Sequence, residues 1–241
     1  MKYKMDLHTH TIASGHAYST LQENIVAAKE LGLRVLGLSE HGPAIPGGPH
    51  MMFFWNLKIV PRQYGDLRLL CGAEANIMDA DGTLDMDDFT LSRLDYCIAS
   101  MHTPCLKQGN VEENTLAAIN AMKNPYVTIL GHPDDGRYPL DYEALVRAAV
   151  EQKVVLEVNN SSVHPLSPRK GAAENILSML EWCKKYECPI LLGTDSHISF
   201  DIGRFDAAEK LLEQAGFPEE LVVNNDLEKL ETVLFRKKRE R

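Results

Sequence analysis

Histidine and acidic residues recur in this chain at the points where predicted β-strands end. Imidazole nitrogens and carboxylate oxygens are ligands for Zn²⁺, Mn²⁺ and Fe²⁺, and barrel folds carry their chemistry at the carboxyl ends of their strands. The spacing therefore predicts a centre that holds several metal ions. The nine candidate ligands are His8, His10, His16, His41, Glu74, His102, His132, Asp195 and His197.

Chance is a poor explanation for this distribution of histidine. The chain has nine histidines among 241 residues, and seven of them belong to the candidate set. Residues two apart in an extended segment point the same way, so His8 with His10, and Asp195 with His197, can serve one cluster. Glu74 ends an otherwise apolar strand, where an unpaired carboxylate would be unfavourable and a bridging metal ligand resolves the problem.

Repeated βα units are the elements that must position these residues. Short apolar or β-branched runs alternate with segments of helical periodicity, which is typical of a parallel sheet or barrel. The predicted strands cover residues 3–7, 35–39, 67–73, 96–100, 127–130, 154–158 and 190–193. The predicted helices cover residues 141–153, 172–186 and 205–215, with another that starts near Thr20 and ends before Gly32. In that first helix Ile25, Ala28 and Leu31 form the predicted inward stripe.

Two loops and the absence of a repeat complete the predicted organisation. Residues 43–48, continued by the bulky apolar residues 51–55, are predicted to form a long loop over the active site. Residues 79–85 contain Asp81-Gly82, which predicts a small hairpin after the third strand. No internal repeat or composition break divides the chain, so we expect one domain over residues 1–241.

Composition indicates an ordinary globular protein. Hydrophobic residues make up 44% of the chain, and no apolar run reaches the roughly 18 residues that a membrane span needs. The first predicted strand begins at residue 3, which leaves no room for a cleavable signal, so we expect a cytoplasmic protein. The five cysteines are odd in number and lack a Cys-x-x-Cys pair, which favours buried free thiols over disulfides.

The charge argues against broad electrostatic binding of nucleic acid or of an anionic membrane. The formal net charge is −9, and three divalent ions would add six positive charges at one end of the molecule. That local field would attract an anionic substrate. Residues 236–241 are basic but lie at a terminus, where we expect a solvated tail.

The candidate ligands also stand in motifs that resemble a known family. In order and spacing the motifs are similar to those of the polymerase and histidinol phosphatase (PHP) superfamily. They are His8-Thr9-His10-Thr11, Ser39-Glu40-His41-Gly42, Gly72-Ala73-Glu74, Ser100-Met101-His102, Gly131-His132-Pro133 and Gly193-Thr194-Asp195-Ser196-His197. Residues 13–20, Glu157-Val158-Asn159-Asn160-Ser161-Ser162 and Arg169-Lys170-Gly171 resemble its YcdX-type branch of stand-alone phosphatases.

The resemblance implies an α/β fold, a distorted (β/α)₇ barrel, with three divalent ions at the carboxyl ends of its strands. By position, His8, His10, Glu74 and Asp195 would hold the first ion, and Glu74, His102 and His132 the second. The third would be held by His16, His41 and His197. Zinc is the ion that the family usually carries, although manganese and iron suit the same donor atoms.

The activity that follows is metal-dependent hydrolysis of a phosphate monoester by a metal-bound hydroxide. Glu74, Asp195 and His10 are the residues expected to carry the catalysis. Arg169 is the first candidate for contact with a small phosphorylated substrate, and the others are Lys170, Arg62 and His50. Each of the four can also be read as an ordinary solvated side chain.

Two other functions stay open from the sequence. One is a PHP-type nuclease or phosphodiesterase, which the acidic charge balance disfavours. The other is a non-catalytic metal-binding module, which the number of ligands disfavours because a structural zinc site needs only four. Self-association into a homo-oligomer is left open as well.

Overall fold

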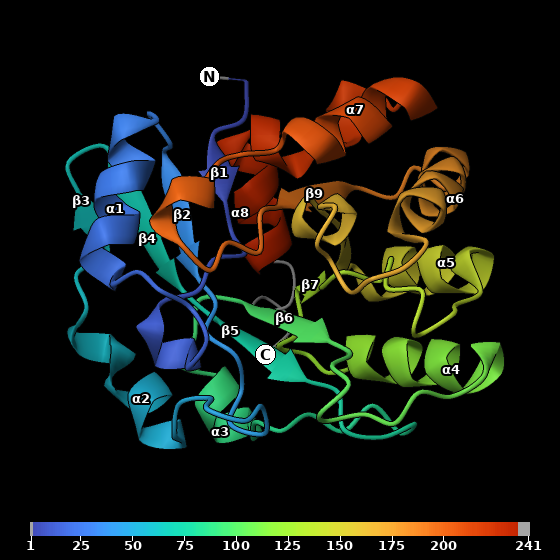
Figure 1. Cartoon of the computed structure of the whole chain (residues 1–241), viewed down its shortest axis with the longest axis horizontal. Helices are drawn as coiled ribbons and strands as arrows, with labels where there is room; N and C mark the ends of the chain where they lie inside the picture. The colour runs from blue at the N-terminus through green and yellow to red at the C-terminus, as the bar shows by residue number, and fades with distance from the viewer. Residues whose placement is uncertain (1, 236–241) are drawn as a thin grey trace.

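Parallel strands form the centre of the fold, which the computed structural model describes for residues 2–235 (Figure 1). One sheet has the order β1-β2-β4-β3 and the other the order β5-β6-β7-β8-β9. All neighbouring pairs are parallel except β3 with β4. The strands are β1 (Met5–Asp6), β2 (Val35–Leu38), β3 (Gln63–Tyr64), β4 (Leu67–Cys71), β5 (Ala73–Asn76), β6 (Cys97–Ser100), β7 (Ile129–Leu130), β8 (Val155–Asn159) and β9 (Ile190–Gly193). The basic segment 236–241 lies outside the described residues.

Each of the seven predicted strands is present, but the third is divided at Gly72 into β4 and β5. A Cβ atom on Gly72 would lie 2.5 Å from Cε1 of the Tyr96 ring, so only glycine allows the chain to pass there. The break begins a new strand at Ala73 and carries Glu74 into the second sheet. The short antiparallel strand β3 was not predicted.

Helices flank the strands (Figure 1). They are α1 (Leu21–Glu30), α2 (Met51–Asn56), α3 (Asp88–Leu91), α4 (Val111–Met122), α5 (Tyr142–Gln152), α6 (Ala172–Lys185), α7 (Asp206–Ala215) and α8 (Leu227–Phe235). Reciprocal hydrogen bonds between Thr20 and Glu23 start α1, as the sequence predicts. The four predicted helices correspond to α1, α5, α6 and α7.

Other local predictions need correction or refinement. Leu31 caps α1 and is 42% exposed, so the inward stripe consists of Ile25 and Ala28 without it. Residues 51–56 form helix α2 where the sequence predicted a continued loop. The predicted hairpin is present as a turn with one antiparallel bridge between Ile77 and Leu84.

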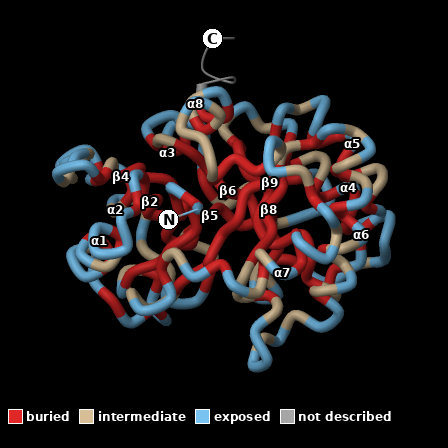
Figure 2. Tube along the Cα trace, turned by 90° about the horizontal axis from the view of Figure 1, so that it is seen from above, coloured by how far each residue is buried: buried red, intermediate tan, exposed pale blue. Residues whose placement is uncertain are grey.

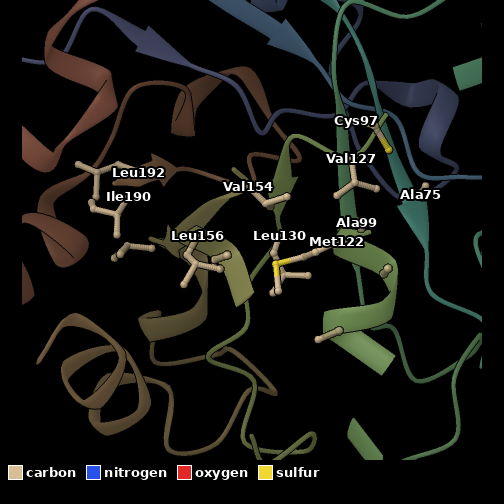
Figure 3. Close-up of a cluster of buried hydrophobic side chains, with 14 of the residues drawn as sticks. Ala75, Cys97, Ala99, Met122, Val127, Leu130, Val154, Leu156, Ile190 and Leu192 are labelled. Carbon is tan, nitrogen blue, oxygen red and sulfur yellow. The ribbon is translucent and has the colours of Figure 1, made fainter. Parts of the chain in front are cut away.

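Two apolar clusters hold the layers together, and the buried residues follow the strands through the middle of the molecule (Figure 2). The larger cluster lies between the strands and the surrounding helices. Figure 3 labels ten of its members: Ala75, Cys97, Ala99, Met122, Val127, Leu130, Val154, Leu156, Ile190 and Leu192. The smaller cluster takes Met5, Val35, Leu70, Ile98, Ile129, Val155 and Leu191 from seven strands and adds Leu230, Val233 and Leu234 of α8.

N-terminal and C-terminal segments of the described chain meet beside β1 and β9. Thr9 and Ser196 form a parallel bridge, and the Asn224 side chain donates to the Met5 and Leu192 carbonyls. Its Oδ1 accepts from the Leu192 backbone N–H at 2.7 Å. The fold is therefore α/β with parallel sheets, and the closed seven-unit barrel stays a prediction.

Two further expectations can be compared with the structure. No helix among residues 2–235 is both long enough and apolar enough to cross a membrane. All five cysteines are free, and four of them are buried, as the sequence predicts.

Candidate metal centre

Glu74 lies in the middle of a group of histidines that come from different strand ends. Its Oε1 is 3.3 Å from Nε2 of His8, 3.3 Å from Nε2 of His102 and 2.9 Å from Nε2 of His132. Its Oε2 is 2.7 Å from Nδ1 of His41 and 3.5 Å from Nε2 of His10. The carboxylate is fully buried, so it contacts these rings out of reach of bulk water.

The remaining candidate ligands join this group from β9 and from the turn before α1. Asp195 Oδ1 lies 3.3 Å from Nε2 of His10 and 3.6 Å from Nε2 of His8. His16 Nε2 lies 3.0 Å from Nε2 of His197 and 3.3 Å from Nε2 of His41. The structure thus brings all nine predicted ligands into one connected cluster.

Several donor atoms in the cluster are buried without a hydrogen-bond partner. They are Nε2 of His8 and Nε2 of His10, together with Nδ1 of His41 and Oε2 of Glu74, which lie 2.7 Å apart without hydrogen-bond geometry. Unpartnered buried polar atoms are unfavourable, and a divalent cation accepts such lone pairs. Within the described residues, ligand atoms of His8, His10 and Glu74 lie within 4.8 Å of one another, as do those of His41, Glu74 and His102. The donor set fits Zn²⁺, Mn²⁺ or Fe²⁺.

The opposite ring nitrogens contact oxygen atoms that fix the orientation of each ring. Nδ1 of His8 lies 2.7 Å from Glu157, and Nδ1 of His102 lies 2.7 Å from Oδ1 of Asn76. Nδ1 of His197 lies 2.9 Å from the Asp195 carbonyl oxygen. A proton on Nδ1 leaves the Nε2 lone pair free, which is the arrangement found in metal-ligating histidines.

Burial and repulsion between rings lower the pKa of His10, His16 and His102 and favour neutral imidazoles there, whereas at His8 the carboxylates of Glu157, Glu74 and Asp195 outweigh burial and hold the pKa well above its usual value. Burial is the largest influence on His102 and lowers its pKa to about 4. Burial and then the neighbouring His41 and His197 hold the pKa of His10 well below its usual value. Burial alone would raise the pKa of Glu74, but the surrounding histidines outweigh it and the pKa lies well below the usual range. An ionised Glu74 beside neutral rings at His10 and His102 is the protonation state that metal binding requires of these residues.

Two ligand residues have backbone angles that favour glycine. His132 has φ of 28° and Asp195 has φ of 52°, although both carry a Cβ atom. Such conformations are unfavourable and persist where the surroundings fix them, most often at functional sites. The backbone at both positions is consistent with selection for ligand placement.

The four residues predicted to contact substrate lie in different places. Both terminal nitrogens of Arg169 donate to Oδ2 of Asp195 at 3.0 Å, so Arg169 belongs to the cluster. His50 caps α2 and is exposed, and Lys170 is exposed in the loop beside Arg169. Arg62 donates to Asp95, which precedes the amino end of β6, and to the Leu57 and Val60 carbonyls. The structure does not bring Arg62 to the metal ligands.

The residues that contact the candidate ligands from outside the cluster were not predicted from the sequence to have a role. Glu157 contacts His8 and also accepts from the backbone N–H of His132 at 2.7 Å. Ser14 and Glu40 stand behind His10, and Asn76 stands behind His102. For Glu157 a signal existed, because it interrupts an apolar strand in the same way as Glu74.

Comparison with known proteins decides the family. The family model described as the PHP domain matches residues 6–161. The chain belongs to the PHP family. A probable phosphatase of Clostridium botulinum strain Hall is 48% identical over 230 residues, which cover 95% of this chain and 93% of the relative. A probable phosphatase of Acetivibrio thermocellus is 46% identical over 238 residues, covering 99% and 98% of the two chains. The predicted family and enzyme class, phosphatase, are therefore confirmed.

Solved structures of more distant proteins share the PHP fold. The histidinol phosphate phosphatase of Lactococcus lactis, solved with zinc, L-histidinol and phosphate, aligns with a TM-score of 0.59 and 18% identity. That alignment covers 90% of this chain and 95% of the other. A chain of archaeal ribonuclease P bound to mature tRNA aligns with a TM-score of 0.61 and 16% identity, covering 98% and 91%. At these identities the likeness concerns the fold alone.

Proposed function

We propose that this PHP-family protein hydrolyses phosphate monoesters at a centre of three divalent ions. The observation that carries the proposal is the set of buried ring nitrogens without hydrogen-bond partners that face Glu74, on His8, His10 and His41. The opposite ring nitrogens of His8 and His10 contact protein oxygens. A non-catalytic module with one structural ion would not need so many converging ligands.

The family resemblance implies three ligand groups. His8, His10, Glu74 and Asp195 would hold one ion, and Glu74, His102 and His132 a second. His16, His41 and His197 would hold the third. Bound divalent ions would supply activation of a water molecule and stabilisation of charge on the phosphate. Zinc is the favoured ion, which agrees with the zinc named for the Lactococcus lactis phosphatase.

The protein's own residues would orient the substrate and the ligands. Glu74 and Asp195 supply the negative charge that keeps cations in the cluster, and His10 lies between them. Arg169, beside Asp195, would donate to phosphate oxygens, because a guanidinium matches the geometry of an oxyanion. Lys170 and His50 are exposed and would contact the organic part of the substrate. Arg62 has no part in the proposal, since its guanidinium is bound elsewhere.

A distorted barrel within one domain is the architecture that suits this function. The apolar cluster that takes one residue from each of seven strands, with α8 packed against it, supports a closed arrangement. The bridge between Thr9 and Ser196 lies where the first and last parallel strands would meet. A barrel would collect the strand ends, and with them the ligands, at one face.

Elemental analysis of the gently purified protein, run beside turnover of an aryl phosphate monoester with and without chelator, tests the proposal. We expect close to three ions per chain and turnover that chelation abolishes and metal restores. A matching aryl phosphate diester should be hydrolysed much more slowly. Absence of tightly bound metal after reconstitution with Zn²⁺ or Mn²⁺ would overturn the proposal, and preferred cleavage of the diester would indicate a phosphodiesterase.

A further inference from the structure

The Ser14 hydroxyl lies between a metal-ligand candidate and a buried carboxylate. Its Oγ is 3.2 Å from Nδ1 of His10 and 2.5 Å from Oε2 of Glu40. All three side chains are fully buried. The contacts form a chain from Glu40 through Ser14 to His10, and the far nitrogen of that histidine faces Glu74 and Asp195.

The hydrogen bonds of Ser14 Oγ have only one consistent set of directions. A carboxylate only accepts, so Ser14 gives its single proton to Glu40. The backbone N–H of His41 donates to Ser14 Oγ at 3.1 Å. One lone pair of Oγ is left, and it faces Nδ1 of His10. His10 must therefore donate from Nδ1, which leaves the lone pair on Nε2.

Local structure holds Glu40 and Ser14 in place. Ser14 ends a 3-10 turn (Ile12–Ser14) whose N-cap is Thr11. The Thr11 backbone N–H donates to both oxygens of Glu40, at 3.1 Å and 3.2 Å, and the Thr11 hydroxyl also donates to Oε1. The Glu40 carboxylate is therefore the acceptor in each of its hydrogen bonds with this turn.

We propose that Ser14 and Glu40 are positioning residues that fix His10 in the tautomer able to bind metal through Nε2. This inference rests on the proposed metal-binding function. Glu157 acts on His8 directly at 2.7 Å, whereas Glu40 acts on His10 through one serine hydroxyl. The same hydroxyl accepts from the His41 backbone, so it also ties a ligand of the third group to a ligand of the first.

The tautomer of His10 can be measured in the metal-free wild-type protein by long-range ¹H–¹⁵N correlation NMR. We expect a proton on Nδ1 of His10, with the signal assigned by comparison with a His10→Gln variant. A proton on Nε2 would overturn the proposal. This measurement needs neither bound metal nor turnover. It therefore tests the hydrogen bonds from Glu40 through Ser14 to His10 even where the protein fails to bind metal and the proposed function is wrong.

The second measurement is metal affinity by competition with a chromophoric chelator. We expect Ser14→Ala to weaken the affinity for one ion by about 10–100-fold, the range for residues that orient metal ligands. Thr115→Val is the matched control, because the Thr115 hydroxyl is also buried but bonds the Val111 carbonyl and the Asp141 backbone N–H. Equal affinities of the wild type and Ser14→Ala would overturn the proposal.

A double-variant cycle tests whether Glu40 acts through Ser14. Glu40→Gln should weaken metal affinity in the wild-type background and have a much smaller effect in the Ser14→Ala background. Fully additive losses of metal affinity would overturn the proposal that Glu40 acts on His10 through Ser14. Where Glu40→Gln fails to fold, the His10 tautomer in Ser14→Ala replaces it: we expect the Nδ1–H form to lose its dominance, and an unchanged tautomer would contradict the proposal.

Discussion

The two sides of the candidate metal centre differ in how firmly the protein holds them. His8, His10, Glu74 and His132, here called the inner half, are buried. His16 and His197, the outer half, lie at the surface, with His16 exposed and the His197 side chain 28% exposed. The Nε2 atoms of the outer half lie 3.0 Å from each other. The difference indicates that packing restrains the side chains of the inner half more than those of the outer half.

Burial explains why the two halves should bind ions with different strength. In the inner half an empty site leaves polar atoms without partners and without water, so losing an ion is unfavourable. In the outer half water can replace a lost ligand. We therefore expect the ion of the outer half to exchange first.

Glu74→Gln should have the largest effect, because the neutral amide keeps the shape of the inner half and removes the charge that bridges two ligand groups. We expect turnover of an aryl phosphate to fall on the order of 10³-fold or more. Glu151→Gln, an exposed carboxylate on α5, is the control and should leave turnover unchanged. Near-normal turnover in Glu74→Gln would contradict a central role for this carboxylate.

The contrast between the halves can be tested by removing one ligand from each side. His16→Ala should lose one ion per chain and lower turnover by about 10–100-fold. His132→Ala, a buried ligand beside Glu74, should lower turnover further and release the ions more completely. Metal content after dialysis and turnover of both variants are the measurements. Equal losses in the two variants would remove the distinction between the halves.

Asp134 lies close behind the inner half and gives the unfolding free energy a defined pH dependence. Burial raises its pKa from 3.8 to about 7, against the influence of Arg169 and Ser162. The folded protein keeps a proton that the unfolded chain has lost, so this contribution is complete below pH 3.8 and disappears as pH rises to about 7. Asp134→Asn should therefore gain stability relative to wild type over that range, by about 4 kcal/mol at most.

Urea unfolding of chelator-treated protein across this pH range measures the effect. Asp201→Asn is the control, because it makes the same substitution at an exposed position. A constant difference between wild type and Asp134→Asn would show that Asp134 does not titrate as proposed.

Gly15→Ala should have the smallest effect and should act on the outer half. Gly15 has φ of 80°, and a Cβ atom there would lie 2.5 Å from the Gly47 carbonyl oxygen. We expect a loss of about 1–3 kcal/mol in unfolding free energy. Gly32→Ala is the matched control, since Gly32 has φ of 74° with open space around it. Similar melting temperatures for the two variants would mean that the approach to Gly47 contributes nothing.

The strands and the positions of the candidate ligands at strand ends were predictable because local sequence determines both. Apolar runs such as residues 190–193 form strands in most settings, and a histidine or aspartate just beyond such a run must appear at the strand end. Helices α4 and α8 were not predicted. The apolar face of α8 becomes recognisable only when it packs against strand residues such as Leu70 and Leu191.

The residues that support the ligands could not be predicted in the same way. Ser14 and Glu40 meet across 26 positions of sequence, and neither residue type indicates such a contact by itself. Arg62 was predicted to bind phosphate because of its charge, but the structure places it away from the candidate ligands. Charge does not indicate at which end of a strand a side chain will lie. Contact between distant segments decides both cases.

The contacts of Asn224 with β1 and β9 have a consequence for when the candidate metal centre can assemble during synthesis. Asn224 joins the first strand to the last, and nearby the Asp6 carboxylate accepts from Thr194, 188 positions away. A ribosome must therefore deliver almost the entire polypeptide before the N-terminal histidines can find their C-terminal partners. Assembly of the centre is a late event in the life of the nascent chain, and an unfinished copy would lack Asp195 and His197 and so could not hold a full set of ions.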